Sequence, residues 1–369
     1  MTDDMLSKIA ISLIPGIGCI NAKALIAYCG SAEQVFKEKE KMLRQIPGIG
    51  TVLAHNIVST NVRPRAEKEM EFLLRNHISA RFYLDTDYPE RLRACPDAPI
   101  VLFVKGEAEM NFPKVLSIVG TRHATDYGKQ LVGQFVASLA ERGYRLTIVS
   151  GLAYGIDIHA HRAALKYGLP TIGVMAHGLE TVYPGLHTAT ANEMVEQKGA
   201  LVTDFLSHST IDRKNFIRRN RIIAGMADAT IVVESAQKGG ALVTAELANS
   251  YNRDVFAFPG KVGDPYSEGA NFLIKSNRAA LIESVEDLEY AMNWEKGKSQ
   301  PDAVQPRLFV DLSPEQQQVV DLLRDEGELA IDIICIKTGL AMSKVSPLLL
   351  ELEFEGLVKG LPGKVFRLK

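Results

Sequence analysis

The middle of the chain opens with Val115-Leu116-Ser117-Ile118-Val119-Gly120-Thr121-Arg122, an apolar run that ends at a glycine and a cation. The run has no polar alternation, which is typical of a strand buried on both faces, as in a parallel sheet covered by helices. Similar runs follow, separated by helical patterns, and together they predict an α/β fold with a Rossmann-like, doubly wound, mostly parallel sheet. The later runs lie at residues 146–149, 171–175, 200–203, 230–233 and 255–258, and helical patterns at 128–142, 157–167 and 241–251.

The N-terminal part contains an internal repeat, Ile14-Pro15-Gly16-Ile17-Gly18 and Ile46-Pro47-Gly48-Ile49-Gly50. Each copy lies between two helical patterns, and its glycines permit a tight turn with positive φ. Such turns also leave amides exposed at the start of the next helix, a position that favours anions. The pattern resembles a tandem helix-hairpin-helix module that grips the DNA backbone. A compact helical domain without DNA contact remains the alternative, because Lys23 alone flanks the first hairpin.

The C-terminal part follows a polar stretch, residues 293–310, that contains two prolines and indicates a linker. Ser313-Pro314-Glu315 is a helix-start pattern, and two more helical segments and a hairpin complete a resemblance to a winged helix. The last helical segment, 342–355, has one lysine and three glutamates, so we favour a protein contact or regulatory role for it. The predicted domains are a helix-hairpin-helix module (1–65), an extended Rossmann-like domain (66–292), a linker (293–310) and a winged helix (311–369).

Composition limits the class of protein. The net charge is −2 and 46% of residues are hydrophobic, as in ordinary folded proteins. No apolar run approaches the roughly 18 residues that a membrane helix needs, and the acidic start does not resemble a signal peptide. The four cysteines are scattered, which favours reduced thiols and no zinc site. We therefore expect a cytoplasmic protein with no membrane partner.

A basic segment lies between two of the predicted strands. Residues 213–221 read Arg-Lys-Asn-Phe-Ile-Arg-Arg-Asn-Arg, with five basic residues in nine, and open a helical pattern at 216–226. In a chain of nearly neutral charge this indicates a local anionic partner, such as a phosphate backbone. A solvated, salt-bridged helix face is the alternative.

The loops after the predicted strands carry small residues and cations. In an open α/β sheet, ligands bind at the carboxyl ends of the strands, where helix N-termini supply N–H groups and partial positive charge. Glycines that merely permit short βα turns would explain one or two of these loops well, but all five of them less well. The candidate residues are Gly120, Thr121, Arg122, Ser150, Gly151, Gly155, Lys238, Gly239, Gly240 and Lys261.

Common catalytic and cofactor motifs are missing from the sequence. There is no GxGxxG after the first predicted strand, no GxxxxGK[ST] and no GxSxG. His159 and His161 are spaced so that their side chains diverge on a helix, which favours helix packing over metal binding, with Asp157 as the helix N-cap. We expect no cofactor, no metal and no catalytic residue.

Several stretches, 117–122, 149–157, 216–224 and 258–260, resemble the DNA-processing protein A family (DprA, also called Smf). The resemblance implies a single-stranded-DNA-binding protein that protects incoming DNA during natural transformation and loads RecA recombinase onto strands coated by single-strand-binding protein. It also implies a homodimer formed through the Rossmann-like domain and no enzymatic turnover.

The resemblance assigns roles residue by residue. Arg122 and Arg218 would hold phosphates, and Arg219 and Asn220 belong to the same basic motif. Phe216 would either stack on a base or anchor the helix in the core, since its spacing to Ile223 fits burial. The sequence departs from the family where Ile217 replaces a usual proline and where Gly239-Gly240-Ala241 replaces Ser-Gly-Ser, a loss for which Lys238 would compensate.

Two other functions stay open. Residues 239–246 also resemble the GGxGTxxE signature of nucleotide phosphoribohydrolases, in which the glutamate helps to cleave a glycosidic bond, although Leu242 stands where a glycine is required. The third possibility is a regulator that binds duplex DNA through the winged helix.

Overall fold

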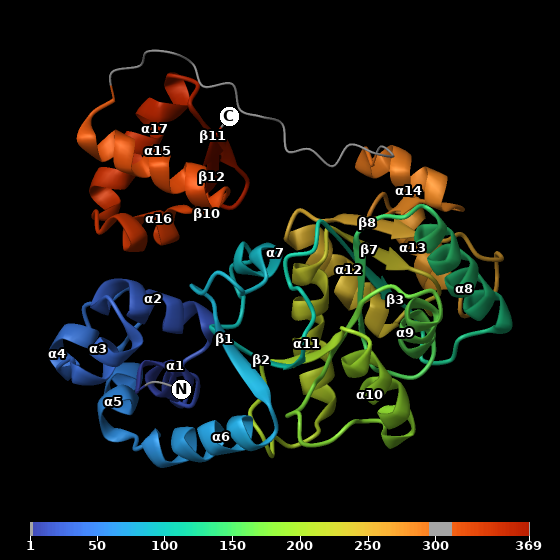
Figure 1. Ribbon diagram of the computed structural model, residues 1–369, viewed down its shortest axis with the longest axis horizontal. Coiled ribbons are helices and arrows are strands. Elements are labelled where there is room, and N and C mark those ends of the chain that lie inside the picture. The colour runs from blue at the N-terminus through green and yellow to red at the C-terminus, as the bar shows by residue number, and fades with distance from the viewer. Residues whose placement is uncertain (1–2, 295–311, 369) are drawn as a thin grey trace. The chain divides into compact units, whose positions relative to one another are not determined.

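The computed structural model describes residues 3–294 and 312–368 (Figure 1). The described residues fall into two compact units. The first unit lies within Met1–Cys19 and Thr60–Lys296, and the second within Ile20–Ser59 and Gly297–Lys369.

The first unit is built on a nine-stranded sheet with strand order β1-β2-β6-β5-β4-β3-β7-β8-β9. The strands from β6 to β9 in that order are parallel, and β1 and β2 add an antiparallel edge. Every residue of β4, β5, β6 and β7 is buried, which confirms strands covered on both faces. The strand bounds are β1 Ile78–Phe82, β2 Val101–Gly106, β3 Lys114–Val119, β4 Leu146–Gly151, β5 Thr171–Val174, β6 Ala200–Thr203, β7 Ala229–Val232, β8 Asp254–Ala257 and β9 Ala280–Leu281.

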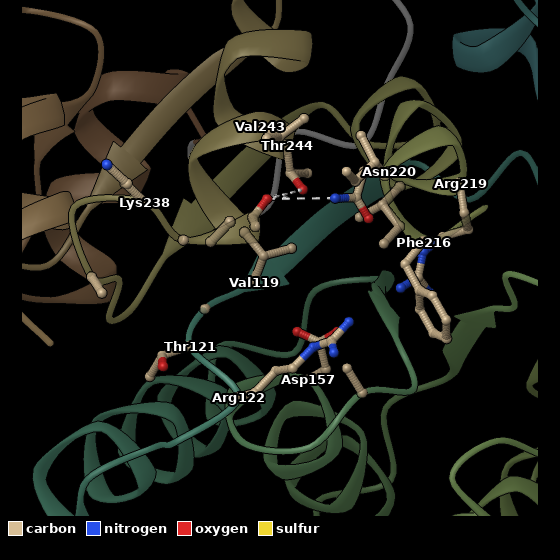
Figure 2. A pocket seen from close by; sticks show the side chains of 18 of the residues that line it. Val119, Thr121, Arg122, Asp157, Phe216, Arg219, Asn220, Lys238, Val243 and Thr244 are labelled. Carbon is tan, nitrogen blue, oxygen red and sulfur yellow. Dashed lines mark hydrogen bonds between the residues drawn. The ribbon is translucent and has the colours of Figure 1, made fainter. Parts of the chain in front are cut away.

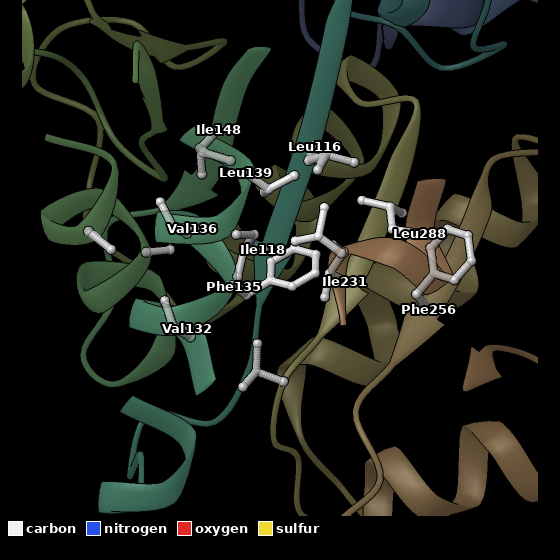
Figure 3. Close-up of a cluster of buried hydrophobic side chains, with 14 of the residues drawn as sticks. Leu116, Ile118, Val132, Phe135, Val136, Leu139, Ile148, Ile231, Phe256 and Leu288 are labelled. Carbon is white, nitrogen blue, oxygen red and sulfur yellow. The ribbon is translucent and has the colours of Figure 1, made fainter. Parts of the chain in front are cut away.

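Helices cover both faces of this sheet, so the predicted doubly wound α/β fold is confirmed. On one face, Phe135 of α8 packs among Ile118, Ile148 and Ile231 from three neighbouring strands (Figure 3). The Phe135 ring also meets the Phe258 ring edge-on, with centroids 5.4 Å apart. The helices are α7 Glu90–Arg93, α8 Asp126–Glu141, α9 Ile156–Lys166, η1 Gly185–His187, α10 Thr188–Glu196, α11 Arg213–Met226, α12 Gly240–Ser250, α13 Glu268–Lys275 and α14 Val285–Met292.

The strand order reverses between β3 and β7. The chain runs from β3 through β4 and β5 to β6 on one side, and then returns through α11 to place β7 on the other side of β3. In open α/β sheets this reversal leaves a crevice beyond the carboxyl ends of the two strands, because their connecting helices lie on opposite faces. The fold therefore positions the loops after β3 and β7 at one opening.

Two helix starts differ from the sequence prediction. Helix α11 begins at Arg213 instead of residue 216, because the side chain of Asp212 caps it by accepting from the amide of Lys214 at 2.7 Å. The prediction that Asp157 caps α9 is wrong. Gly155 is the N-cap residue, with φ of 77°, and Asp157 lies buried inside the first turn. The predicted packing role of His161 is confirmed, since its ring nitrogens lie 2.7 Å from Thr171 Oγ1 and 2.7 Å from the Gly151 carbonyl.

Each copy of the N-terminal repeat forms a turn between two helices, as predicted. The turns hold Gly16 (φ 81°) between α1 and α2, and Gly48 (φ 84°) between α4 and α5. Helix α6 runs across the predicted domain boundary after residue 65, and its buried Glu69 accepts hydrogen bonds from Ser207 in the first unit. The helices are α1 Asp3–Ser12, α2 Cys19–Cys29, α3 Ala32–Lys37, α4 Glu40–Leu43, α5 Thr51–Ser59 and α6 Arg63–Arg75.

The C-terminal region has the three helices and the small sheet of a winged helix, which confirms that prediction. Helix α15 starts with a capping box between Ser313 and Gln316. Most of the predicted linker, 293–310, lies outside the described residues, but Trp294 packs edge-on against Tyr144 at 5.7 Å. The elements are α15 Pro314–Glu326, β10 Leu329–Ala330, α16 Ile331–Thr338, α17 Met342–Phe354, β11 Val358–Leu361 and β12 Val365–Leu368, with sheet order β10-β12-β11.

Within residues 3–294 and 312–368, no single helix is long and apolar enough to cross a membrane. The pair α16–α17 has sufficient length and hydropathy only when its two helices are taken together, and they are bent by 113°.

Candidate nucleic-acid interface

A cavity of about 430 Å³ opens at the point where the strand order reverses (Figure 2). Four segments line it: the loop after β3, the first turn of α9, the first turns of α11, and the loop into α12. The residues used below are Gly120, Thr121, Arg122, Asp157, Arg213, Phe216, Arg219, Asn220, Lys238, Gly239 and Gly240.

The loop after β3 is held by backbone contacts on both sides. The amide of Thr121 donates to the carbonyl of Glu234 at 2.7 Å, and its carbonyl accepts from the amide of Ile156 at 3.1 Å. The buried Glu234 carboxylate also accepts from the amide and hydroxyl of Thr125. A Cβ on Gly120 would lie 2.4 Å from Ile156, so only glycine permits this close approach. The backbone that carries Arg122 is therefore fixed before any ligand binds.

The Arg122 guanidinium lies over the Phe216 ring in the wall of the cavity. Arg122 is exposed, and its guanidinium carbon lies 5.3 Å from the centroid of the Phe216 ring. Phe216 is half-buried, and its other ring neighbour is Tyr183 at 5.8 Å. The structure thus places Phe216 in the wall of the cavity and does not bury it as a core anchor. Its ring remains partly available to a ligand.

The floor of the cavity carries a buried pair of opposite charges. Asp157 is 8% exposed and Arg219 is 4% exposed, and in Figure 2 the Arg122 side chain also lies beside Asp157. Burial raises the pKa of Asp157 to about 6, and the nearby guanidinium groups of Arg219 and Arg122 oppose that rise. Burial also lowers the pKa of Arg219 to about 10. Arg219 donates to the Val174 carbonyl, so it supports the cavity from below.

The loop into α12 offers backbone amides. Gly239 is the N-cap of this 11-residue helix and provides no side-chain cap, so the first amides of α12 have no capping side chain. Nothing lies within 4 Å of the position where Gly240 would carry a Cβ, which leaves open space in front of these amides. The Asn220 amide reaches the Gly240 carbonyl at 3.4 Å and joins α11 to this loop. An uncapped helix start of this kind favours an anion.

Three exposed cations surround the cavity without ion pairs. Among the described residues, no carboxylate lies within 4 Å of the charged atoms of Arg122, Arg213 or Lys238. Arg213 was missed in the sequence analysis. Its signal was present, because it precedes Phe216 by three positions and residues at this spacing share a helix face. Exposed cations that line one cavity, with no carboxylate within 4 Å, are a suitable surface for a phosphate group, although the nearby charge of Asp157 offsets part of that of Arg122.

The structure brings together nine of the predicted site residues and separates five. The nine that line the cavity are Gly120, Thr121, Arg122, Phe216, Arg219, Asn220, Lys238, Gly239 and Gly240. The other five are Ser150, Gly151, Gly155, Arg218 and Lys261, and none of them lines it.

Three of these five residues have structural roles. The hydroxyl of Ser150 is buried and donates to the Ile118 carbonyl at 2.6 Å. A Cβ on Gly151 would collide with Asp157 and Arg219, and one on Gly155 would lie 2.1 Å from the Thr121 carbonyl, so both glycines shape the fold.

Arg218 and Lys261 are both exposed but lie outside the cavity. Arg218 faces away from it, with Nη2 3.4 Å from Asp204 and its guanidinium 5.2 Å from the Phe205 ring centroid. Lys261 follows β8 in a loop that contributes nothing to the lining.

The cavity also lacks the group that a phosphoribohydrolase would need. Glu246, the glutamate of the GGxGTxxE-like stretch, is half-exposed and paired with Arg278. It does not line the cavity. In the part of the chain that the structure describes, no three His, Cys, Asp or Glu side chains gather into a possible metal site.

Comparison with known protein families gives two matches along the chain. The family model of the DNA recombination-mediator protein A matches residues 79–293, and the DprA winged helix domain matches residues 303–364. The chain belongs to the DNA recombination-mediator protein A family. The first match contains all the strands of the large sheet except the first residue of β1, and every residue that lines the cavity.

Individual family members agree with this assignment. The chain is 38% identical to Protein Smf of Escherichia coli (strain K12) over 291 residues, which cover 76% of this chain and 75% of that protein. It is 39% identical to the DNA processing protein DprA of Bacillus subtilis (strain 168) over 202 residues, covering 54% and 67%.

Two solved structures of this family are also similar. DprA of Streptococcus pneumoniae has a TM-score of 0.64 at 29% identity and covers 79% of this chain and 98% of its own. DNA processing protein A of Helicobacter pylori, a structure described for its single-stranded DNA binding mode, has a TM-score of 0.52 at 26% identity, covering 58% and 95%.

Proposed function

We propose that this protein binds single-stranded DNA and holds a backbone phosphate in the cavity between the loop after β3 and the start of α12. The observation that carries this proposal is the convergence of three exposed, unpaired cations on an uncapped helix start. Arg122, Arg213 and Lys238 supply charge, and the amides of α12 supply fixed donors. This combination recognises phosphate without reading base identity, since its donors are aimed at the backbone.

The Phe216 ring supports a single strand over a duplex. Its half-buried position beside Arg122 leaves a flat apolar surface next to the phosphate-binding groups. Bases stack on such rings only when they are not stacked in a duplex, and this interaction tolerates any sequence. The cavity of about 430 Å³ lies toward the lower end of the range for small-molecule pockets, roughly 300–1,000 Å³. It is suited to one nucleotide unit and not to a double helix.

The role in recombination rests on the family. The matching model is named for a recombination mediator, and the Helicobacter pylori structure is described for its single-stranded DNA binding mode. We propose that the protein protects incoming strands during transformation and loads RecA recombinase onto strands coated by single-strand-binding protein. We also propose that it acts as a homodimer and without enzymatic turnover.

A fluorescence anisotropy titration of the full chain with labelled oligo-dT tests the DNA-binding part. We expect binding that weakens with salt by about 0.7 log units of affinity per log unit of salt for each phosphate contact. Unlabelled duplex of the same length should compete poorly, and a preference for one sequence of a hundredfold or more would contradict backbone recognition.

The downstream roles have separate tests. RecA ATPase activity on strands coated by single-strand-binding protein should start sooner when the protein is added. Light scattering after size exclusion should give the mass of a dimer, and incubation with nucleoside monophosphates should release no free base. The absence of any effect on RecA would leave a DNA-binding protein without the proposed mediator role.

A further inference from the structure

Exposed apolar side chains lie next to the cavity but do not line it. Tyr183 is 46% exposed and Tyr154 is 44% exposed. Neither tyrosine hydroxyl has a hydrogen-bond partner among the described residues. Tyrosine rings that are open to water beside a cavity are available to a ligand, because each ring has a flat apolar face.

The two loops that carry these tyrosines are joined by one buried histidine. His187 is 4% exposed and its Nδ1 lies 2.9 Å from the Leu152 carbonyl. The Tyr154 ring meets the His187 ring edge-on, at 5.1 Å and 70°. The loop after β4 is therefore tied to the segment 183–187, and both tyrosines are held on a fixed frame.

This surface continues directly from the cavity. The Tyr183 ring lies 5.8 Å from the Phe216 ring, and the Phe216 ring carries the Arg122 guanidinium at 5.3 Å. A cation, Arg122, is thus followed by two aromatic rings, Phe216 and Tyr183. This order suits a nucleic-acid strand, in which each phosphate is followed by a base. A strand whose phosphate occupies the cavity has to leave it, and the Tyr183 ring adjoins the cavity on the side of Phe216.

We propose that Tyr183, with Tyr154 beyond it, forms a stacking surface for the bases of nucleotides that adjoin the phosphate held at Arg122. The ligand is thus the unpaired base of a single-stranded nucleic acid, and the surface extends the site beyond one nucleotide. This inference rests on the proposed function, because it places a second contact on the same strand. A protein partner is the other possible occupant, and continuity with the unpaired cations favours the nucleic acid.

The test compares two probes on the full chain: a labelled oligo-dT and an abasic oligomer of the same length, which has the phosphates but no bases. Tyr183→Ala should weaken binding of oligo-dT by about 5- to 150-fold, the range for one stacked base. Binding of the abasic oligomer and the salt slope should not change. Tyr154→Ala should show the same selectivity with a smaller loss.

Three controls separate stacking from folding. Tyr183→Phe keeps the ring and should restore binding, whereas Tyr183→Leu keeps apolar bulk without an aromatic face and should not. Tyr167→Ala removes a tyrosine that is 39% exposed at the opposite end of α9 and should bind both probes normally. Thermal melting should show that every variant used is folded.

Two results would overturn the inference. An equal loss of affinity for oligo-dT and for the abasic oligomer in Tyr183→Ala would assign Tyr183 to phosphate binding or to folding. Unchanged oligo-dT binding in both Tyr183→Ala and Tyr183→Leu would instead indicate that a protein occupies this surface. Failure of the proposed function is a distinct outcome, since the unsubstituted chain would then bind neither probe.

Discussion

The cavity of the large sheet and the winged helix both carry basic side chains, but the two regions differ in whether these side chains form ion pairs with carboxylates. Of the six basic residues between 312 and 368, four form ion pairs with neighbouring carboxylates. Around the cavity, Arg122, Arg213 and Lys238 have no such pair among the residues described. The paired residues of the winged helix are Arg324, Lys337, Lys344 and Arg367.

The difference shows that the number of basic residues does not locate a phosphate site. Lys344 is the only basic residue of α17, and Glu315 lies 2.8 Å from its Nζ. A surface ion pair of this kind contributes only about 0–1 kcal/mol to stability, but a phosphate would have to displace the carboxylate and approach three more glutamates. We therefore expect α17 to contact protein and the cavity to contact DNA.

Arg122→Ala should give the largest loss of single-strand binding. Removing a charged hydrogen-bond donor from a phosphate should weaken affinity by about 10- to 150-fold, from roughly 1.5–3 kcal/mol. The salt slope should fall by about 0.7 if one phosphate contact is lost. The matched control is Arg145→Ala. Arg145 is an exposed arginine that directly precedes β4 and forms an ion pair with Glu109. Unchanged single-strand affinity and an unchanged salt slope in Arg122→Ala would show that the cavity is not the phosphate-binding site.

Phe216→Ala separates a stacking residue from a structural one. We expect a loss of about 1–3 kcal/mol in binding if its ring stacks on a base. Because Phe216 is half-buried, the loss of stability should be smaller than the roughly 3–5 kcal/mol for a buried phenylalanine. A titration and a thermal melt on the same sample decide between the roles. A large drop in melting temperature with proportionate loss of binding would restore the core-anchor interpretation.

Proton binding at Asp157 should affect affinity in the cavity. Burial raises the pKa of this carboxyl to about 6, so it is neutral below that pH and negatively charged above it. A negative charge on the cavity floor repels phosphate, so single-strand affinity should fall by about 3- to 10-fold, roughly 0.7–1.4 kcal/mol, as pH rises from 5 to 7.

The isosteric variant Asp157→Asn checks the origin of that pH dependence. It should bind with less dependence on pH between 5 and 7. The raised pKa also means that the contribution of Asp157 to folding stability is full below the unfolded value, near 4, and declines as pH rises through about 6. An identical pH profile in Asp157→Asn and the unsubstituted chain would assign the dependence to another group.

Deleting residues 311–369 should have the smallest effect. Since most basic side chains there are paired, single-strand affinity should stay within about threefold of the full chain. The comparison uses the same oligo-dT titration at two salt concentrations. Loss of binding on truncation would identify the winged helix as the primary DNA site and reverse the comparison.

Much of the fold could be predicted because its signals are local. Strands without polar alternation predicted the covered sheet, and the repeated Ile-Pro-Gly-Ile-Gly predicted two turns between helices. The arrangement of the basic segment was less predictable, because it depends on where α11 begins. The Asp212 cap starts the helix at Arg213, which places Arg213 with Phe216 and turns Arg218 toward Asp204.

Tertiary burial also escaped prediction from the sequence. Asp157 fits an N-cap by spacing, but Gly155, with its positive φ, is the N-cap, and Asp157 lies in the first turn of α9, in the cavity floor near Arg219. Ser150 and Gly151 follow a strand as ligand-binding residues do, yet contacts from β3, α9 and α11 enclose them. These outcomes depend on segments far apart in the chain, and neither periodicity nor composition records them.

Photo-crosslinking with an oligonucleotide that carries 5-iododeoxyuridine tests the central claim most directly. The full chain is irradiated with the bound strand, digested, and the modified peptides are identified by mass spectrometry. We predict crosslinks to the peptides that contain Phe216 and Tyr183, and their loss in Arg122→Ala under conditions of weak binding. Crosslinks confined to residues 312–368, with none in residues 115–258, would contradict the account.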